Sequence, residues 1–544
     1  MIRHYLDYIK HAMLENWNAP AITDFESPCA YTYGELAAKM AEMNVMFEQL
    51  GLKAGDRIAI CGRNSSNWGV AYLSVAAYKG IVVSILPEFT SESIYQLVSH
   101  SEARALLIGP WVRGRIELGN MPNIETFISI DDLCIIQAKN DVSIDKIRDI
   151  YKQRFPDEHS LREWVSNLPT DNMADVAVIN YTSGSTGSPK GVMITHRNLS
   201  SNVTYGQDNI PNHAGWTVVS MLPLAHMFGL MFEFLYQLAG GTHVYFLTKS
   251  LTPALLMKAF KQVHPYMILT VPLVLEKIFK KQIFPIIEKP IIKVLWYTPL
   301  INITLRKKVY RSLMNAFGGN LQYIIVGGAA LSEDVERCLK QIHFPYTCGY
   351  GMTECAPILC YEHWKKFAFR SCGKVVDRME IKIDSDNPRK HEGEILVRGD
   401  NVMRGYYKNM EATDNIFTDD GWMRTGDIGI VDRKGNLFIK GRSKNMILGP
   451  SGQNIYPEEI EDKLNSMDGV AESIIVERNG KLIGLVFPDS LRDLDIEKIK
   501  MLMQENLQKL NKLLPGFSKV SDIELVDKEF EKTPKRSIKR FLYK

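Results

Sequence analysis

Strand and helix patterns alternate along this chain, and the alternation is the feature that most limits the folds open to it. Apolar residues recur near helical spacing over 35–50, and residues 57–61 follow as a short buried strand. A second helix pattern over 68–78 leads into another apolar strand. The same rhythm returns at 199–245 and at 267–328. Alternation of this kind predicts an α/β fold with parallel sheets.

The pattern changes after Gly393, where short alternating strands predict a β-rich part. The C-terminal part has its own α+β pattern, with helices expected over 457–467 and 495–514 and strands over 472–476 and 482–486. A chain of 544 residues is too long for one hydrophobic core. We therefore expect about three or four folding units.

Composition excludes several classes of protein. The net charge of +3 predicts no nucleic-acid partner, and 45% hydrophobic residues are ordinary for a globular protein. The most apolar stretch, 221–246, carries His226 and Glu233, which favours a buried core segment over a membrane span. The eight cysteines show no C-x-x-C spacing, so we expect a reduced compartment and no structural zinc. Charge breaks up the N-terminal apolar residues too often for a signal peptide, and we expect a cytoplasmic protein.

A loop rich in hydroxyl groups and glycine lies at 180–191, with the sequence Asn-Tyr-Thr-Ser-Gly-Ser-Thr-Gly-Ser-Pro-Lys-Gly. Between Thr182 and Ser188 every side chain is a hydroxyl group or a hydrogen, which leaves the backbone amides open to an anion. Lys190 adds a compact positive charge. These residues favour a phosphate-binding loop.

The loop differs from the common nucleotide loop, because only two residues separate Gly187 from Lys190 and no helix follows. Buried strands are expected on both sides of it, at 176–181 and 192–195. The alternative interpretation is a flexible surface turn between two strands. The loop alone does not decide between them.

Four further stretches combine glycine with charge in apolar surroundings. Small residues at 327–331 leave room for a flat ring, and Glu354 carries the oxygen ligands that Mg²⁺ prefers. Asp427 can accept hydrogen bonds from two neighbouring ribose hydroxyls, and Arg442 can donate to a sugar or a phosphate. Each residue singly is better explained as an ordinary surface or turn residue. Their joint occurrence in this order indicates a nucleotide site.

With these motifs together, the chain resembles the adenylate-forming superfamily, which includes acyl-CoA synthetases, adenylation domains of peptide synthetases and firefly luciferase. The segment 181–191 looks like the family's phosphate loop, 349–354 like its adenine and magnesium motif, and 424–427 like its ribose motif. The segment 442–444 is similar to the junction with a mobile C-terminal domain. The resemblance covers nearly the whole chain.

The resemblance implies an N-terminal domain over 1–441, built from layered α/β subdomains plus a β-rich subdomain. A small mobile α+β domain over 442–544 would turn about a hinge at Lys444. It also implies that Tyr350 stacks on adenine and that Glu354, with Thr186, holds Mg²⁺. The implied nucleotide-binding residues are Thr182, Ser183, Gly184, Ser185, Thr186, Gly187, Lys190, Gly328, Ala329, Tyr350, Gly351, Thr353, Asp427 and Arg442.

The implied reaction has two steps. A carboxylate attacks the α-phosphate of Mg·ATP to form acyl-AMP and pyrophosphate, and the thiolate of coenzyme A then displaces AMP. Positioning and charge neutralisation dominate such a step. The resemblance assigns the catalytic roles to Lys190, Thr353, Glu354, His226 and a C-terminal lysine.

The C-terminal lysine is where this chain departs from the family pattern. Relatives usually end with Gly-Lys-Ile-x-Arg, but the alignment of Ile538 and Arg540 places Ser537 at the lysine position. Lys535 and Lys539 lie two residues away on either side, and an extended segment would place both on one face. We favour Lys535, because it follows Thr-Pro as part of the family motif does. The alternative is that this basic tail is merely solvated.

The segment 222–229 resembles the family's acyl-pocket wall, and it assigns His226 and Gly229 to that pocket. It has no aspartate to pair an amino-acid ammonium, and Gly351 stands where acetate-specific relatives carry a bulky aromatic residue. These features, with the fatty-acid-ligase-like segment 420–427, favour a medium- or long-chain fatty acid. His226 can equally be a core histidine. An enzyme that passes acyl-AMP to a carrier-protein thiol or stops at the adenylate, and a nucleotide-binding protein without turnover, stay open as alternatives.

The segment 276–311 interleaves lysine and arginine with apolar residues and contains only two acidic residues, Glu276 and Glu288. An apolar body with a basic rim suits peripheral contact with a membrane surface. The alternative is a pair of helices whose lysines form an ordinary solvated face.

Overall fold

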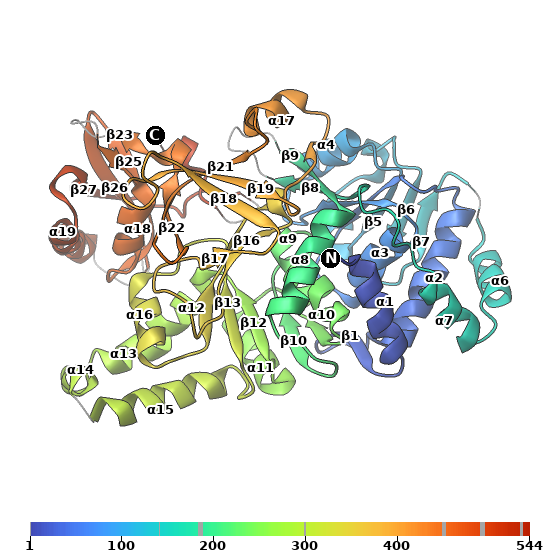
Figure 1. Cartoon of the computed structure of the whole chain (residues 1–544), viewed down its shortest axis with the longest axis horizontal. Helices are drawn as coiled ribbons and strands as arrows, with labels where there is room; N and C mark the ends of the chain where they lie inside the picture. Colours follow the sequence, from blue (N-terminus) through green and yellow to red (C-terminus); the bar gives the residue numbers. More distant parts are fainter. Residues whose placement is uncertain are drawn as a thin grey trace.

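The computed structural model describes residues 2–140, 142–182, 189–298, 301–448, 453–489, 496–533 and 537–543. Figure 1 shows the N-terminal half on the right, a second α/β layer at the lower left, a β-rich part above the centre and the C-terminal domain at the upper left. The fold is α/β with several sheets, as the sequence predicts. None of the described helices is long and apolar enough to cross a membrane.

The first large sheet has eight strands, and its central strands are parallel. Three of its inner strands are nearly continuous apolar runs, interrupted by Arg57 and Ser84, as is typical of strands with both faces buried. The expected parallel sheet is thus confirmed in the centre, whereas β7, β9 and β20 pair antiparallel. In spatial order the strands are β20 (Gly405–Tyr406), β9 (Lys190–Thr195), β8 (Val176–Thr182), β4 (Ile81–Ile85), β3 (Arg57–Cys61), β5 (Ala105–Ile108), β6 (Thr126–Ser129) and β7 (Ile135–Ala138).

Helices cover this sheet, and their starts follow from capping residues. The helix expected from residue 35 begins two residues earlier, because Thr32 and Glu35 form a capping box at its N-terminus. Ser65 caps the next helix more simply, because its hydroxyl oxygen accepts a hydrogen bond from the Trp68 amide. The helices of this part are α1 (Tyr5–Glu15), α2 (Tyr33–Gln49), α3 (Ser66–Ala77), α4 (Ser91–Ser101), α5 (Pro110–Arg113), η1 (Leu118–Asn120), α6 (Ile144–Arg154), α7 (Glu158–Ser166) and α8 (His196–Asn209).

The second large sheet has seven strands and is parallel except for its edge strand β2. Two of its strands come from residues 20–32 and the other five from residues 217–348. Segments far apart in the sequence thus share one sheet. The spatial order is β14 (Tyr346–Cys348), β13 (Tyr323–Val326), β12 (Met267–Thr270), β10 (Thr217–Ser220), β11 (His243–Phe246), β1 (Pro20–Asp24) and β2 (Ala30–Thr32).

Helices also connect the strands of this second sheet, and the described part of the segment 276–311 is mostly helical, with non-helical residues at 288–289 and 298. Helices at this segment are compatible both with a membrane-contact surface and with an ordinary solvated helix pair. The two interpretations differ only in which side chains are exposed. The connecting elements are α9 (Met227–Gly229), the π-helical η2 (Leu230–Leu235), α10 (Tyr236–Ala239), α11 (Pro253–Val263), α12 (Pro272–Ile278), the π-helical η3 (Phe279–Ile283), α13 (Phe284–Ile287), α14 (Pro290–Tyr297), α15 (Ile301–Ala316) and α16 (Glu333–Gln341).

The β-rich part consists of two small antiparallel sheets. One carries the segment 349–354, and the other carries the segment 424–427. Their elements are β15 (Tyr350–Gly351), η4 (Thr353–Cys355), β16 (Ile358–Tyr361) and β17 (Lys374–Val375), then β18 (Met379–Asp384), β19 (Gly393–Gly399), α17 (Met410–Ile416), β21 (Met423–Val431) and β22 (Leu437–Arg442).

The C-terminal part matches the expected α+β pattern and adds three strands that the sequence pattern does not reveal, the two-residue strands β23 (Ile447–Leu448) and β24 (Asn454–Ile455) and the longer β27 (Val520–Leu525). In β27 only Val520 is buried, and its three apolar residues do not alternate along the strand. This strand pairs parallel to β26 and completes a three-stranded sheet. The other elements are η5 (Ser443–Asn445), α18 (Pro457–Asn465), β25 (Val470–Arg478), β26 (Lys481–Pro488), α19 (Ile496–Leu513), η6 (Gly516–Ser518) and η7 (Arg540–Leu542).

Candidate functional site

The expected phosphate loop joins β8 and β9, which pair antiparallel as neighbouring strands. Thr182 and Lys190 end and begin these strands and lie opposite one another. The residues between them that the sequence assigns to the nucleotide, Ser183, Gly184, Ser185, Thr186 and Gly187, lie outside the described residues. The described geometry thus places the two ends of the loop and Lys190 at the end of a buried hairpin.

Lys190 and Glu354 are brought together by Tyr406, a residue that the sequence motifs do not include. The strand β20 pairs with β9 so that Tyr406 lies opposite Val192. The Lys190 ammonium is 4.9 Å from the centre of the Tyr406 ring, and the Tyr406 hydroxyl donates a 3.0 Å hydrogen bond to Glu354 Oε1. Burial and the neighbouring carboxylate raise the pKa of Tyr406, which keeps its hydroxyl protonated as a donor.

Glu354 lies in η4, directly after β15, and its side chain is half-buried. Its backbone carbonyl accepts a 2.8 Å hydrogen bond from the amide of Met403, which ties this turn to the chain that leads into β20. Thr353, to which the resemblance assigns a catalytic role, is 6% exposed and precedes Glu354 in the same turn. The turn therefore presents one carboxylate beside Lys190.

Tyr350 and Asp427 form the second contact between distant segments. The Tyr350 hydroxyl donates a 2.6 Å hydrogen bond to Asp427 Oδ2, and Arg442 Nε lies 3.0 Å from Asp427 Oδ1. Asp427 and Arg442 lie opposite one another because β21 and β22 pair in that register. Burial raises the pKa of Asp427, and the Arg442 guanidinium opposes that rise. Asp427, which is expected to bind ribose, thus contacts both Arg442 and Tyr350, the residue expected to stack on adenine.

The segment after β13 lies beside β15 because the Gly349 amide donates a 2.9 Å hydrogen bond to the Val326 carbonyl. Gly328 has a φ of 86°, a backbone conformation that glycine adopts without strain. Gly328 and Ala329 are both exposed. Glycine has no side chain and alanine a small one, so this edge stays open, as the flat-ring interpretation requires.

The expected acyl-pocket segment packs against the same region. The ring of Phe228 lies over Gly327, where an added Cβ would meet its ring atoms at 3.0 Å. The Nδ1 atom of His226 accepts a 3.3 Å hydrogen bond from the Phe228 amide and caps the short helix α9. An added Cβ at Gly229 would lie 2.5 Å from the Pro223 carbonyl oxygen. Glycine is therefore required there by packing, whichever acid binds.

Gly351 also has a packing reason that the sequence does not reveal. An added Cβ would lie 2.2 Å from the backbone oxygen of Pro357, across the hairpin of β15 and β16. The hairpin thus needs glycine at this position independently of any acyl chain. The assignment of Gly351 to the acyl pocket stays a prediction, and the structure adds no separate support for it.

Glu233 is a buried carboxylate that the site motifs do not include. It lies in η2, is 0% exposed, and its Oε2 accepts hydrogen bonds from the Ser220 hydroxyl and from the amides of Met221 and Leu222 at 2.9–3.0 Å. Burial raises its pKa well above the usual range. Its signal in the sequence is a lone acid in the apolar stretch 221–246. The contacts hold the start of the expected acyl-pocket segment against β10.

The junction at Lys444 lies in η5, directly after β22 and therefore directly after Arg442. Beyond it, Asp462 accepts a 2.7 Å bond from Arg370, and the Lys280 ammonium donates a 2.6 Å hydrogen bond to the Asn465 carbonyl. These contacts attach α18 to the N-terminal part in the arrangement of Figure 1.

Lys535 lies outside the described residues, whereas Lys539 is described. The Lys539 ammonium forms a 3.3 Å ion pair with Glu531. Lys532 and Ile538 form an antiparallel bridge, so they lie on pieces of chain that run in opposite directions. The expectation that Lys535 and Lys539 share one face assumed an extended segment instead. Lys539 thus takes part in a contact within the C-terminal domain.

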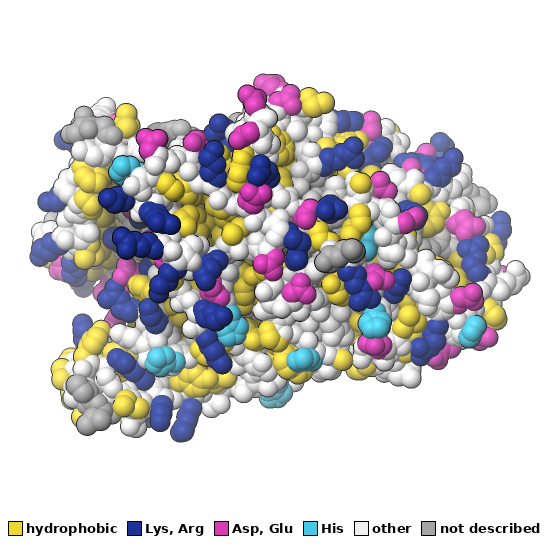
Figure 2. Space-filling view, viewed as in Figure 1, with side chains coloured by type: hydrophobic (Ala, Val, Ile, Leu, Met, Phe, Trp, Pro, Cys, Tyr) yellow, Lys and Arg dark blue, Asp and Glu magenta, His cyan; other side chains and the backbone are white. Residues whose placement is uncertain are grey.

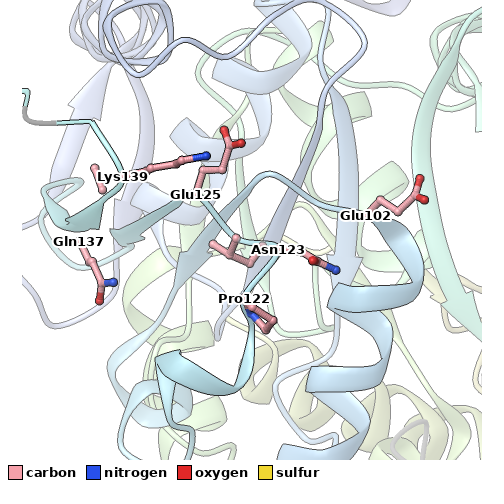
Figure 3. A pocket seen from close by; sticks show the side chains of 8 residues that line it. Glu102, Pro122, Asn123, Glu125, Gln137 and Lys139 are labelled. Atoms are coloured by element: carbon pink, nitrogen blue, oxygen red, sulfur yellow. The ribbon is translucent and has the colours of Figure 1, made fainter.

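A polar pocket of about 690 Å³ lies elsewhere, at the edge of the first sheet (Figure 3). Residues 122–125 and 137–139 line it together with Glu102, and no residue predicted for the nucleotide is among them. Its glutamates already form ion pairs, Glu102 with Lys408 at 2.7 Å and Glu125 with Arg104. We therefore assign this pocket to the protein surface and not to the nucleotide site.

Within the described ranges, no group of three or more histidine, cysteine, aspartate or glutamate side chains is arranged to hold a metal ion. A magnesium ion that arrives with ATP needs no such group, because it takes most of its ligands from phosphates and water and one or two from carboxylates. Glu354 fits that smaller requirement, because the hydrogen bond that it accepts from Tyr406 involves only its Oε1 atom.

The two α/β sheets, the β-rich part and the small C-terminal domain form the architecture of adenylate-forming enzymes. The chain is similar in fold to the crystal structure of ATP-bound MatB from Rhodopseudomonas palustris, with a TM-score of 0.75 and 21% identity over 99% of this chain and 98% of that one. The chain belongs to the AMP-binding enzyme family, because the family model matches residues 9–407 and the model of the family's C-terminal domain matches residues 444–543.

Curated relatives of the chain are acyl- and aryl-activating enzymes. A probable acyl-activating enzyme 16 from Arabidopsis thaliana is 26% identical over 85% of this chain and 73% of that protein. Long-chain-fatty-acid–CoA ligase 4 from Saccharomyces cerevisiae is 33% identical, over 58% of this chain and 48% of that protein. A 4-coumarate–CoA ligase from Vanilla planifolia is 28% identical over 84% and 78%. The chain is thus an adenylate-forming enzyme of the acyl- and aryl-CoA ligase type.

Proposed function

We propose that the protein ligates a medium- or long-chain fatty acid to coenzyme A in two steps. In the first, a carboxylate oxygen of the acid bonds to the α-phosphorus of ATP and pyrophosphate leaves. In the second, the thiolate sulfur of coenzyme A bonds to the acyl carbon of acyl-AMP and AMP leaves with the electron pair of the broken bond. The observation that carries this proposal is the convergence of Tyr350, Asp427 and Arg442 at 2.6 and 3.0 Å.

The proposed nucleotide contacts follow from that convergence. Asp427 receives the ribose hydroxyls while Arg442 keeps its charge balanced, and the ring of Tyr350 lies against adenine beside the open edge at Gly328 and Ala329. Each oxygen of Asp427 has two lone pairs, so it can keep its present partner and still accept from ribose. This arrangement fixes the sugar before chemistry begins.

At the other end of the nucleotide, the amides of residues 182–188 and Lys190 neutralise the phosphates that leave as pyrophosphate. Glu354 holds the magnesium ion, with Thr186 as a second ligand, and the ion supplies charge neutralisation on the phosphates. Thr353 lies beside Glu354 and contacts the α-phosphate. Lys535 bridges the α-phosphate and the attacking carboxylate in the first step, and rotation about Lys444 then exposes acyl-AMP to coenzyme A.

The choice of a fatty acid is supported by the wall of the expected acyl pocket. The segment from Leu224 to Leu235 is apolar and mostly buried, apart from the inward-bonded Glu233 and the helix-capping His226. The one carboxylate of this segment, Glu233, is 0% exposed and its Oε2 accepts three hydrogen bonds from the protein, so the segment presents no accessible carboxylate to an amino-acid ammonium. The long-chain-fatty-acid ligase among the relatives points in the same direction.

The experiment is AMP release by the purified protein with ATP, Mg²⁺ and coenzyme A across acetate, octanoate, palmitate and 4-coumarate. The proposal expects the highest kcat/KM for octanoate or palmitate, because each buried methylene contributes about 0.8 kcal/mol. A preference for 4-coumarate or acetate would refute the fatty-acid assignment. Palmitate-dependent ATP–pyrophosphate exchange without thioester formation would point to a carrier-protein acceptor or to an enzyme that stops at acyl-AMP.

A further inference from the structure

The outer surface of α13, α14 and the start of α15 is apolar, and we call it the α14 patch. It consists of side chains whose exposed fractions are 49–76%, namely Ile286, Ile291, Val294, Tyr297, Ile301 and Ile303. Seventeen large apolar side chains are exposed among the described residues, and six of them fall within this short segment. Single exposed apolar residues are normal on a protein surface, but a cluster of this density indicates an interaction site.

The outward direction of the patch is set by a buried anchor on the opposite side of α14. Trp296 is 2% exposed, and its indole Nε1 donates a 2.7 Å hydrogen bond to Gln341 at the end of α16. The Arg306 guanidinium lies 5.6 Å from the indole ring centre. With 3.6 residues per turn, Ile291 and Val294 share the face of α14 that points away from Trp296. The anchor therefore holds these two side chains toward the outside.

The patch is surrounded by unpaired positive charge. The segment 276–311 contains nine lysine and arginine residues and two glutamates, a net charge of +7, so the rest of the chain has a net charge of −4. Five exposed cations flank the apolar side chains, and none of them forms an ion pair with a described residue: Lys289, Lys293, Lys307, Lys308 and Arg311. Figure 2 shows yellow and dark-blue side chains together at the lower left, where Figure 1 places α13, α14 and α15.

We propose that the α14 patch docks the protein on an anionic lipid bilayer. Ile291 and Val294 enter the boundary between headgroups and acyl chains, while Lys289 and Lys293 contact lipid phosphates. This surface would let a fatty acid reach the enzyme from the bilayer, a consequence that rests on the proposed function. The docking itself requires neither the nucleotide nor the acid.

Charge distinguishes this partner from the other candidates. A symmetric second copy would place two segments of net charge +7 against each other, and like charges across an interface are unfavourable. A nucleic acid would use the lysines but leave the exposed isoleucines in water. An anionic bilayer is the partner whose chemistry uses the apolar centre and the basic rim together.

The test is co-sedimentation of the full-length protein with vesicles, without ATP, fatty acid or coenzyme A. Vesicles of phosphatidylcholine mixed with phosphatidylglycerol should bind the protein, pure phosphatidylcholine vesicles should bind it much less, and added salt should release it. The double variant Ile291→Asp/Val294→Asp should weaken binding by at least about tenfold, and Lys289→Gln/Lys293→Gln should weaken binding to the anionic vesicles. Because no substrate is present, the result is independent of the proposed reaction.

The matched control is Met410→Asp in α17, since Met410 is 75% exposed and Ile291 is 76% exposed. That variant should bind vesicles as the wild type does. A milder variant, Ile291→Ser/Val294→Ser, and thermal unfolding of every variant separate loss of docking from loss of folding. The proposal is overturned if the wild type does not bind anionic vesicles, if both patch variants bind unchanged, or if the wild type is a dimer that the patch variants dissociate.

Discussion

The Tyr406 hydroxyl donates a 3.0 Å hydrogen bond to Oε1 of Glu354, while the same ring lies under the ammonium of Lys190. The three residues come from β20, η4 and β9, which are far apart in the sequence. Tyr406 therefore joins the predicted magnesium ligand to the predicted phosphate-binding lysine. Its hydrogen bond also ties the Glu354 side chain to the first sheet, because the donor lies on a strand that is paired to β9.

Replacement of Tyr406 by phenylalanine keeps the ring beneath Lys190 and removes the hydrogen bond to Glu354. We expect the rate of ATP–pyrophosphate exchange to fall about tenfold, since a hydrogen bond to a charged group contributes about 1.5–3 kcal/mol. The matched control is Tyr407→Phe, because the Tyr407 hydroxyl bonds instead to Glu102 at 3.1 Å on the surface. Equal exchange rates in both variants would show that Tyr406 does not position Glu354.

Asp427→Asn tests the proposed ribose contact. The change removes the charge that pairs with Arg442, and we expect the dissociation constant for ATP to rise at least about tenfold. Equilibrium binding of ATP measures this directly, without turnover. The control is Asp420→Asn, since Asp420 lies in the same segment and bonds to the Thr418 hydroxyl at 2.6 Å. An unchanged affinity in Asp427→Asn would remove Asp427 from the nucleotide site.

The two candidate lysines of the C-terminal tail can be separated by single changes. Lys535→Ala should reduce acyl-AMP formation by at least about a hundredfold, because a positioned charge at the transition state contributes several kcal/mol. Lys539→Ala should leave it within about twofold, because an exposed ion pair such as that of Lys539 with Glu531 contributes little. Thioester formation from added acyl-AMP should persist in both variants. The reverse order of effects in the exchange assay would assign the role to Lys539.

Two buried histidines predict a loss of stability in mild acid. His4 and His196 stack at 5.1 Å, and burial lowers the pKa of His4 to about 4 and that of His196 to about 3. Their unfolded-state pKa is near 6.5, so below that pH the unfolded chain binds more protons than the folded chain. The free energy of unfolding should therefore fall by about 1 kcal/mol per histidine between neutral pH and about pH 5.5.

Urea unfolding at the two pH values measures this loss. His4→Asn is the informative variant, because an asparagine can still cap α1 by accepting from the Leu6 amide as His4 does. The variant should lose less stability on acidification than the wild type does. The same loss in both proteins would place the acid sensitivity elsewhere.

Much of the fold follows from local patterns. The hairpin that flanks 183–188, the parallel centre of the first sheet and the helix α18 were all expected from apolar periodicity and capping residues. The strand β27 was not, because its three apolar residues, Val520, Ile523 and Leu525, do not alternate along the strand and so give no strand period. Gly351 shows a different limit, since its close approach to the Pro357 carbonyl depends on how the hairpin folds back.

Most of the order of strands and helices can be read from local sequence patterns, and so can the residue types of the predicted nucleotide motifs. These are properties of short segments, where periodicity, glycine and charge act locally. Three relationships appear only in the folded protein: Tyr406 meets Glu354 and Lys190, Tyr350 bonds to Asp427, and Trp296 turns Ile291 outward. Those contacts depend on strand register and on helix packing between distant segments, which no single stretch of sequence specifies.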